Sequence, residues 1–418
     1  MHEPLVVIGG SYAGLQIALS ARSAGFEGPI LLVGDEPHLP YQRPPLSKGF
    51  LTGKVAESAL PIRPQQVLEQ NRIEPILGVR ATAIDRASRT VSLSDGRSLA
   101  YGRLALAVGC RPRLLPVPGA DLEGVLYLRT LDDAIALKAR MPHANSVAII
   151  GGGFIGLEIA ASLAMLGKEV TVIEALPRVL ARALPERVSD FLTDVHRRAK
   201  VTVRTGTTVR ELEGAAGHVR SVLLSDGTRC PADFVIVGIG VLPNVELAAE
   251  AGLACQDGIV IDEFARTTDP TIVAAGDCTR HPNRFAPAAQ IRLESVQNAL
   301  DQAKTAGGAI VGTLKPYDAV PWFWSDQYDL KLQMVGLSEG HDQAVVRGSP
   351  EEQKFSVFYF RKGALIGIDS INRPGDHMAG RQLIPAGVPL TPEQVADPSF
   401  DLVRFVTAAR KAAPASAA

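Results

Sequence analysis

The chain has 418 residues, of which 46% are hydrophobic and 21% charged, a balance typical of a soluble globular protein of about three domains. Its formal net charge of −1 excludes a general electrostatic attraction to nucleic acid or to an anionic membrane. No apolar run approaches the ~20 residues of a membrane helix, and the first predicted strand begins at Leu5, before a secretory signal could fit. We therefore expect a cytoplasmic protein with no nucleic-acid or membrane partner.

Cysteine usage argues against metal and disulfide chemistry. The chain has four cysteines, and no two of them form a C-x-x-C pair. We therefore expect no metal and no redox disulfide, and we interpret the cysteines as buried thiols in a reducing cytoplasm. They are Cys110, Cys230, Cys255 and Cys278.

The first 35 residues predict a βαβ unit. Leu5–Ile8 is a short apolar run that suits a buried parallel strand, and it leads directly into the glycine turn Gly9–Gly14. Leu15–Ala24 then predicts a helix, and a second apolar strand, Ile30–Val33, is followed closely by Asp35. An acid about 20 residues beyond the glycines is the layout of a dinucleotide-binding fingerprint.

Each part of this pattern has a chemical reason. Small residues let the backbone approach a pyrophosphate, and the helix start offers N–H groups to the anion. Asp35 is placed to accept hydrogen bonds from an adenosine ribose. Ser11 stands where G-x-G-x-x-G has its middle glycine. A single turn of this kind is weak evidence, and a plain strand-turn-helix explains it equally well.

The next hundred residues predict mainly short strands. Pro37–Lys48 is proline-rich and predicts a rigid loop without regular structure, and the prolines of residues 111–118 mark a domain crossing. The predicted strands are Ile73–Gly78, Ala81–Ile84, Thr90–Leu93 and Leu104–Gly109.

The fingerprint then repeats. Val147–Ile150 leads into Gly151–Gly156, an intact G-x-G-x-x-G, and Leu157–Leu166 predicts the helix. Val170–Ile173 is the second strand, and it ends at Glu174. Because an internal repeat of about 140 residues is far more specific than either copy alone, we predict two nucleotide sites.

The remainder completes the second unit and adds another domain. Helices are predicted over Glu186–Ala199 and Ser295–Ile310, and Phe355–Phe360 and Ala364–Ile371 alternate like an antiparallel hairpin. We predict an α/β fold of two Rossmann-like dinucleotide-binding domains with a C-terminal α+β domain. The expected segments are residues 1–112 and 245–320 for the first dinucleotide domain, 113–244 for the second, and 321–418 for the C-terminal domain. Further strands are expected at residues 201–203, 209–212, 222–224, 234–240, 259–261 and 272–275.

At this point the chain resembles a known family. The paired fingerprints, the LSK loop Leu46–Lys48, the stretch Thr268–Asp277 and the block PWFWSDQY, Pro321–Tyr328, are similar to the FAD-dependent ferredoxin reductases. These are the putidaredoxin-reductase and biphenyl-dioxygenase-reductase group of the glutathione-reductase-like flavoproteins. The resemblance implies FAD on the first fingerprint and NADH on the second. It further implies a [2Fe–2S] ferredoxin as acceptor, serving a cytochrome P450 or a ring-hydroxylating oxygenase.

The resemblance also implies site residues. Ala13 would contact the FAD pyrophosphate, Asp277 the ribityl chain and Val296 the pyrimidine edge, while Lys48 would lie beside the isoalloxazine and approach Glu158. Lys48 and Glu158 are therefore the expected catalytic residues. Apart from the resemblance, the two tryptophans of PWFWSDQY lie two apart and would point the same way on a strand, and we expect the outer one, Trp324, to be the docking residue for the ferredoxin. The other expected FAD contacts are Gly9, Ser11, Gly14, Asp35, Arg43, Ala81, Arg129 and Gly276. The expected NADH contacts are Gly151, Gly153, Ile155, Gly156, Glu174, Arg182 and Gly240.

Other interpretations remain open from the residues alone. Lys48 could be an ordinary solvated lysine, Asp277 a turn residue, and Glu158 a complement to its helix dipole. A disulfide or peroxide reductase would need a redox cysteine within residues 36–60, which contain none. A binding or signalling flavoprotein like apoptosis-inducing factor usually carries a targeting segment or a long insertion, and we see neither. We expect a monomer or a weak dimer.

Overall fold

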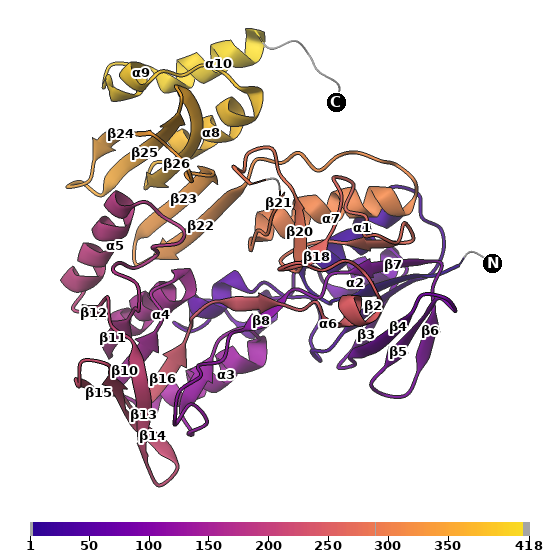
Figure 1. The fold of residues 1–418 in the computed structure, drawn as a ribbon, viewed down its shortest axis with the longest axis horizontal. Coiled ribbons are helices and arrows are strands. Elements are labelled where there is room, and N and C mark those ends of the chain that lie inside the picture. Colours follow the sequence, from indigo (N-terminus) through magenta and orange to yellow (C-terminus); the bar gives the residue numbers. More distant parts are fainter. Residues whose placement is uncertain (1–2, 289, 413–418) are drawn as a thin grey trace. The chain divides into compact units, whose positions relative to one another are not determined.

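The computed structural model describes residues 3–288 and 290–412, which form two compact units (Figure 1). The first unit contains Met1–Gln42, Ser58–Arg111 and Leu242–Phe323. The second contains Arg43–Glu57, Pro112–Val241 and Trp324–Ala418. Each unit is built around a five-stranded parallel sheet, and the described residues of the second unit also form two antiparallel sheets.

The parallel sheet of the first unit has the strand order β19-β7-β1-β2-β3. Leu5 pairs with Ile30 on one side and with Arg103 on the other. After β1 the chain adds β2 and β3 on one side of it, and later strands, β7 and β19, lie on the other side. The strand order therefore reverses beside β1, and such a topological switch point is where sheets of this kind bind ligands. The main elements are β1 (Leu5–Ile8), α1 (Tyr12–Ser23), β2 (Ile30–Gly34), β3 (Ile73–Leu77), β7 (Arg103–Leu106), β19 (Ile272–Ala274) and α7 (Val296–Ile310).

Smaller elements complete the first unit. Two three-stranded sheets have the orders β4-β5-β6 and β18-β20-β21. Their bounds, with those of two short helices, are α2 (Gln65–Gln70), β4 (Ala81–Asp85), β5 (Thr90–Leu93), β6 (Ser98–Ala100), α6 (Glu246–Glu250), β18 (Ile259–Val260), β20 (Thr279–Pro282) and β21 (Gln290–Ile291).

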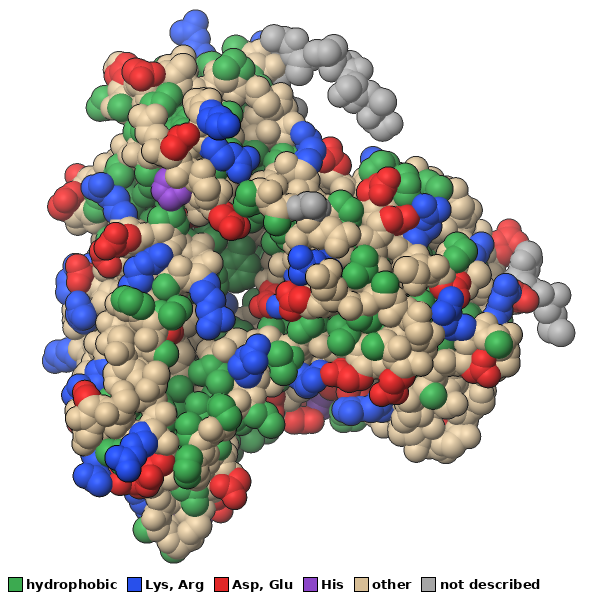
Figure 2. All heavy atoms as spheres, viewed as in Figure 1, with side chains coloured by type: hydrophobic (Ala, Val, Ile, Leu, Met, Phe, Trp, Pro, Cys, Tyr) green, Lys and Arg blue, Asp and Glu red, His purple; other side chains and the backbone are tan. Residues whose placement is uncertain are grey.

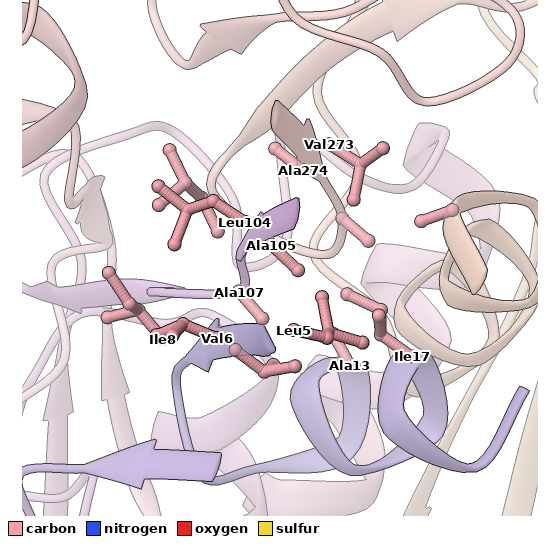
Figure 3. Close-up of a cluster of buried hydrophobic side chains, with 14 of the residues drawn as sticks. Leu5, Val6, Ile8, Ala13, Ile17, Leu104, Ala105, Ala107, Val273 and Ala274 are labelled. Carbon is pink, nitrogen blue, oxygen red and sulfur yellow. The ribbon is translucent and has the colours of Figure 1, made fainter. Parts of the chain in front are cut away.

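The core of the first unit lies where β1, β7 and β19 meet α1 (Figure 3). Apart from Arg103 at the start of β7, these strands are apolar because both faces of a parallel sheet are covered, and Leu5, Leu104 and Ala274 have no exposed surface. Helices α1 and α7 approach closely at Gly307, where an added Cβ would lie only 2.5 Å from the Cβ of Ser20. Only glycine allows this packing, so α7 is held firmly against the first glycine-turn helix.

The second unit repeats the pattern with the strand order β12-β11-β10-β16-β9. An antiparallel sheet, β13-β14-β15, is attached to it. The bounds are β9 (Val125–Tyr127), α3 (Leu131–Arg140), β10 (Ser146–Ile150), α4 (Phe154–Met165), β11 (Glu169–Ile173), α5 (Glu186–Arg198), β12 (Thr202–Arg204), β13 (Val209–Ala215), β14 (His218–Leu224), β15 (Arg229–Pro231) and β16 (Phe234–Val237).

The antiparallel sheet of the C-terminal part has the order β22-β23-β26-β25-β24. Strands β25 and β26 are joined by Lys362 and Gly363, which both have positive φ, as a two-residue hairpin turn requires. The bounds are β22 (Trp322–Gln327), β23 (Leu330–Gly336), β24 (Gln343–Ser349), β25 (Lys354–Arg361), β26 (Ala364–Ile371), α8 (Pro374–Ala386), α9 (Pro392–Ala396) and α10 (Leu402–Ala412). Three short elements lie where the chain passes from one unit to the other. They are the 3₁₀ turn η2 (Glu57–Ala59) and the strands β8 (Cys110–Pro112) and β17 (Val241–Pro243).

The predicted fold class is confirmed, with differences at particular elements. Both glycine-turn helices begin three residues before the predicted start, at Tyr12 and Phe154, because the helix already starts inside the turn. The expected loop at residues 37–48 contains a 3₁₀ turn, η1 (Pro44–Ser47), since proline presets the required φ. Helix α3 was not predicted, although Thr130 and Asp133 form a capping box that the sequence shows.

No helix among the described residues is long and apolar enough to cross a bilayer. Acidic and basic side chains are interspersed over the face shown in Figure 2, in keeping with the net charge of −1.

We predict that Asp369 makes stability depend on pH. Its carboxyl is buried in β26 and accepts a hydrogen bond from Tyr359, 2.8 Å away, and burial raises the pKa of Asp369 to about 7. The folded state therefore holds the proton that the unfolded chain releases near pH 4, so stability falls as pH rises from about 4 to about 7. Asp369→Asn removes this loss and should stabilise the fold by on the order of 3 kcal/mol above pH 7, but little below pH 4.

Thermal unfolding of the parent and of Asp369→Asn between pH 4 and pH 8 measures the effect. Glu339→Gln, at an exposed position in the same domain, is the control. A difference between Asp369→Asn and the parent that does not grow with pH would contradict the assignment.

Candidate functional site

The first glycine turn follows β1 and is shaped by close backbone contacts. Gly9 has φ +121°, and a Cβ there would lie 2.1 Å from the carbonyl oxygen of Ala107. A Cβ on Gly14 would lie 1.8 Å from the carbonyl oxygen of Gly9. These two glycines therefore allow β1, α1 and the end of β7 to meet, which brings the α1 N-terminus to the carboxyl edge of the sheet.

Ser11 departs from the fingerprint without disturbing it. Ser11 is the N-cap residue of α1, and its counterpart in the second fingerprint is Gly153, the N-cap of α4. A Cβ on Gly153 would meet nothing within 4 Å. The middle position of this turn therefore tolerates a small side chain, unlike the first and last glycines.

The turn after β19 lies beside the start of α1. Gly276 has φ +89°, and a Cβ there would lie 3.1 Å from the Cβ of Ala13 and 3.8 Å from that of Ala299. Asp277 follows and lies 3.5 Å from the thiol of Cys110. The structure thus brings together the expected FAD residues Ala13, Gly276 and Asp277 at the sheet edge. Val296 begins α7, three residues before Ala299.

Asp35 lies just beyond the end of β2, as predicted. Its carboxylate forms an ion pair with Arg80, at 3.3 Å, and both side chains are largely exposed. Such a surface pair contributes little to stability, so Asp35 can exchange this partner for ribose hydroxyls at small cost. Ala81, also expected at the adenine half, directly follows Arg80 at the start of β4.

The second glycine turn has the same geometry. Gly151 has φ +109°, and a Cβ there would lie 2.2 Å from the carbonyl oxygen of Gly238, while one on Gly156 would lie 2.3 Å from that of Gly151. Glu174 follows β11 and accepts hydrogen bonds from the backbone N–H groups of Gly152 and Leu176, at 2.7 and 2.8 Å. The predicted acid therefore lies directly at the turn.

Three other expected NADH residues are exposed in the second unit. Ile155, in the first turn of α4, is 44% exposed although it is apolar, and Arg182 and Gly240 are also exposed. Arg178 instead donates to the carbonyl oxygens of Ala181 and Leu184, so its guanidinium is occupied within its own loop.

Lys48, which is partly exposed, forms an ion pair with the buried Glu158, with Nζ and Oε2 2.7 Å apart. The same Oε2 accepts a hydrogen bond from Ser47, and Oε1 accepts one from Ser325 at 2.7 Å. Ser162 of α4 donates to the carbonyl oxygen of Ser47, at 2.8 Å, and so fastens η1 to the helix. A buried carboxylate is stable only when paired and hydrogen-bonded, and here every partner is in place.

Two more expected FAD residues meet in the second unit. A guanidinium nitrogen of Arg43 donates to the carbonyl oxygen of Arg129, at 2.6 Å. The backbone N–H of Arg129 donates to Asp133, the capping-box acid of α3. The loop that carries Lys48 is therefore held at both ends.

The chemistry of the described side chains suits a bound dinucleotide better than a thiol or metal centre. The four cysteines are free thiols, and burial raises the pKa of Cys278 to about 12, so this thiol does not ionise near neutral pH. Among the residues that the structure describes, no three His, Cys, Asp or Glu side chains are grouped as metal ligands.

The helix starts fit the phosphates of FAD and NADH. Neither α1 nor α4 has a side-chain cap or an acid in its first turn, so their N–H groups can bind an anion. Helix α3, by contrast, is capped by its own Thr130.

Sequence analysis missed three partners of the expected residues: Ser47, Ser325 and Cys110. Ser47 and Ser325 stand inside the LSK and PWFWSDQY motifs, but nothing in the motifs shows that both hydroxyls donate to Glu158. Cys110 was assigned only a buried thiol, and its contact with Asp277 joins positions far apart in the chain.

The chain is similar to known proteins along nearly its whole length. The sequence profile of the family described as pyridine nucleotide-disulphide oxidoreductase matches residues 3–303, and the profile described as reductase C-terminal matches residues 322–406. Rhodocoxin reductase of Rhodococcus erythropolis is 48% identical over 398 residues, which cover 95% of this chain and 93% of that protein.

Two solved structures are similar over nearly the whole chain. The ferredoxin reductase for the CYP199A2 system from Rhodopseudomonas palustris has a TM-score of 0.94 and 46% identity, covering 97% of this chain and 100% of that one. Putidaredoxin reductase, in its covalent complex with putidaredoxin, has a TM-score of 0.94 and 42% identity, covering 99% and 100%.

We predict that Asp277→Ala weakens flavin retention by about tenfold, because it removes a charged hydrogen-bond acceptor from the expected ribityl site. The flavin-to-protein ratio after gel filtration and a fluorescence titration of added FAD measure this. Asp318→Ala, at an exposed residue paired with Arg284 in the same unit, is the control. If Asp277→Ala holds FAD as tightly as the parent, the placement of the ribityl chain is wrong.

Proposed function

Because the chain belongs to the pyridine nucleotide-disulphide oxidoreductase family, we propose that it is an FAD-dependent NADH:ferredoxin oxidoreductase. The observation that carries this proposal is the combination of two dinucleotide turns with a Lys48–Glu158 ion pair and no cysteine in residues 36–60. The similarity to rhodocoxin reductase and to putidaredoxin reductase, each along nearly the full chain, supports it.

The residues of the chain bind and orient the reactants. The N-terminus of α1 and the acid Asp35 would hold the pyrophosphate and adenine ribose of FAD, and Asp277 the ribityl chain. The N-terminus of α4 and Glu174 would hold NADH. When bound, FAD supplies the redox chemistry, since it accepts a hydride and passes electrons on singly.

Lys48 and Glu158 supply fixed charge rather than a nucleophile. Their ion pair holds the ammonium group of Lys48 in one position, where we propose that it faces the isoalloxazine. Glu158 would approach the nicotinamide amide. A reaction of this kind depends on orientation and electrostatics. The hydrogen bonds from Ser47 and Ser325 hold the Glu158 carboxylate in place, and with it the ammonium group of Lys48.

Disulfide or peroxide reduction is disfavoured on the same fold. Such a reductase needs a cysteine near the flavin in residues 36–60, where the sequence has none. We therefore propose a one-electron acceptor, a [2Fe–2S] ferredoxin that serves a cytochrome P450 or a ring-hydroxylating oxygenase. We further propose that the protein is cytoplasmic and a monomer or a weak dimer.

The test is to reduce the purified protein with NADH under anaerobic conditions and to ask which iron–sulfur proteins then pass electrons to cytochrome c. We expect a yellow protein with one FAD, bleached by NADH, and reduction of cytochrome c only when a ferredoxin is added. Bleaching without transfer to any ferredoxin would favour a binding or signalling flavoprotein.

We predict that kcat/KM is higher for NADH than for NADPH. Glu174 lies at the ribose end of the second turn, where a carboxylate accepts from both ribose hydroxyls and repels a 2′-phosphate. Glu174→Gln loses the charge and keeps an oxygen for only one of the backbone N–H groups of Gly152 and Leu176, so the preference for NADH over NADPH should narrow by about tenfold. The exposed Arg182 is the side chain that could reach a phosphate. Comparable kcat/KM values for the two nucleotides in the parent would refute the assignment.

We predict that Trp324→Ala impairs ferredoxin reduction by about tenfold or more while flavin reduction by NADH stays nearly intact. Trp324 lies half-buried on the edge strand β22, and Ser325 points to the opposite, buried face. Because the chain is nearly neutral, attraction to an acidic ferredoxin needs a local basic patch, so added salt should also slow the reaction.

Stopped-flow flavin bleaching beside ferredoxin-coupled cytochrome c reduction measures both steps. Trp322→Ala, which removes the other tryptophan of the same strand, is the matched control and should affect ferredoxin reduction less. Equal losses in both assays would mean that Trp324 is structural, and no loss in either would move the docking site elsewhere.

A further inference from the structure

The two oxygens of Glu158 are held by partners from different segments of the chain. Oε2 accepts from Lys48 and Ser47, which lie on the η1 turn, whereas Oε1 accepts only from Ser325, in the contacts that the structure gives. Ser325 has no exposed surface and belongs to β22, in the C-terminal sheet. The carboxylate expected at the nicotinamide is thus held on one side by a residue 167 positions away in the chain.

Ser325 is the last member of a longer chain of buried hydrogen bonds. The side-chain N–H of Gln327 donates to the Ser325 hydroxyl, at 3.2 Å. The Gln327 oxygen lies 2.9 Å from Nε2 of His196, and Nδ1 of His196 lies 3.0 Å from the hydroxyl of Tyr328. The chain therefore runs from Tyr328 through helix α5 to Glu158.

The direction of each hydrogen bond follows from the groups present. Burial lowers the pKa of His196, so its imidazole is neutral and carries one N–H. The Gln327 oxygen can only accept, so this N–H is on Nε2, and Nδ1 accepts from Tyr328. Every donor in the chain then points toward Glu158. Hydrogen bonds aligned in one direction strengthen one another and favour the negative charge at the end they point to.

We propose that Ser325 is a positioning residue of the reductive half-reaction, which holds Glu158 so that its other oxygen stays on Lys48. Gln327 and His196 support it by fixing the Ser325 hydroxyl. The inference rests on the proposed function, because it assigns a role within hydride transfer from NADH.

The physical reason is that a buried carboxylate oxygen without a donor is costly. Without the Ser325 hydroxyl, the Glu158 carboxylate would turn to find another donor and would weaken its contact with Lys48. A serine with only a structural role would stabilise the packing of β22 on α4 without affecting the contact between Lys48 and Glu158. The two roles predict different results for the same variants.

The main test is stopped-flow reduction of the flavin by NADH in Ser325→Ala. We expect the limiting rate to fall about tenfold, the usual effect of losing a hydrogen bond to a charged group, while the dissociation constant of NADH changes less than twofold. Ser325→Thr keeps the hydroxyl and should restore most of the rate. Ser356→Ala is the matched control, because Ser356 is a fully buried serine of the same sheet whose hydroxyl donates to Ser370 instead.

A second measurement does not depend on turnover. Lys48 of the purified protein is acylated with an amine reagent and quantified by mass spectrometry. We expect labelling to increase several-fold in Ser325→Ala and to stay at the parent level in Ser356→Ala. If Ser325→Ala does not fold, Gln327→Met breaks the hydrogen-bond chain one step further back and should slow flavin reduction about threefold.

The proposal is overturned if Ser325→Ala and Ser356→Ala reduce the flavin at equal rates, or if Ser325→Ala weakens only NADH binding. It is also overturned if Lys48 labelling is the same in both variants. A parent protein that NADH does not reduce would refute the proposed function instead, and the labelling contrast would still decide whether Ser325 positions Glu158.

Discussion

The buried carboxylate of Glu158 is the constraint on which the second unit depends. A charge at this depth costs several kcal/mol unless partners replace the lost water, and two separate segments supply them. Lys48 and Ser47 come from the η1 turn, and Ser325 comes from β22. This requirement explains why Arg43–Glu57 belongs to the second unit although it lies in sequence between strands of the first. The same contacts that satisfy the charge also fix the ammonium group of Lys48.

The two dinucleotide turns show which parts of a fingerprint are obligatory. In both, the first and last glycines lie against backbone carbonyl oxygens at distances that no side chain permits. The middle position is open, and this is why Ser11 can replace glycine in the first turn. What the turns share is therefore a contact geometry between strand and helix, and the anion-binding helix start follows from it.

The sequence predicted those features that depend on local patterns. The apolar strands, the glycine turns, the helix predicted over Ser295–Ile310 and the hairpin between β25 and β26 agree with the structure, since spacing and turn chemistry decide them. The Lys48–Glu158 pair was expected only through the family resemblance. Ser325 could not have been found from the sequence, because its role depends on a contact across 167 positions. No local pattern records such a contact.

Fold and site together describe a protein that receives electrons in pairs and releases them singly, and one measurement tests this most directly. Under anaerobic conditions, the FAD-loaded protein is mixed with a limiting amount of NADH and an excess of oxidised [2Fe–2S] ferredoxin, and both are followed by their spectra. We expect two ferredoxins to be reduced for each NADH oxidised, with the flavin returned to its oxidised form. Oxidation of NADH that leaves the flavin reduced and the ferredoxin oxidised would contradict it.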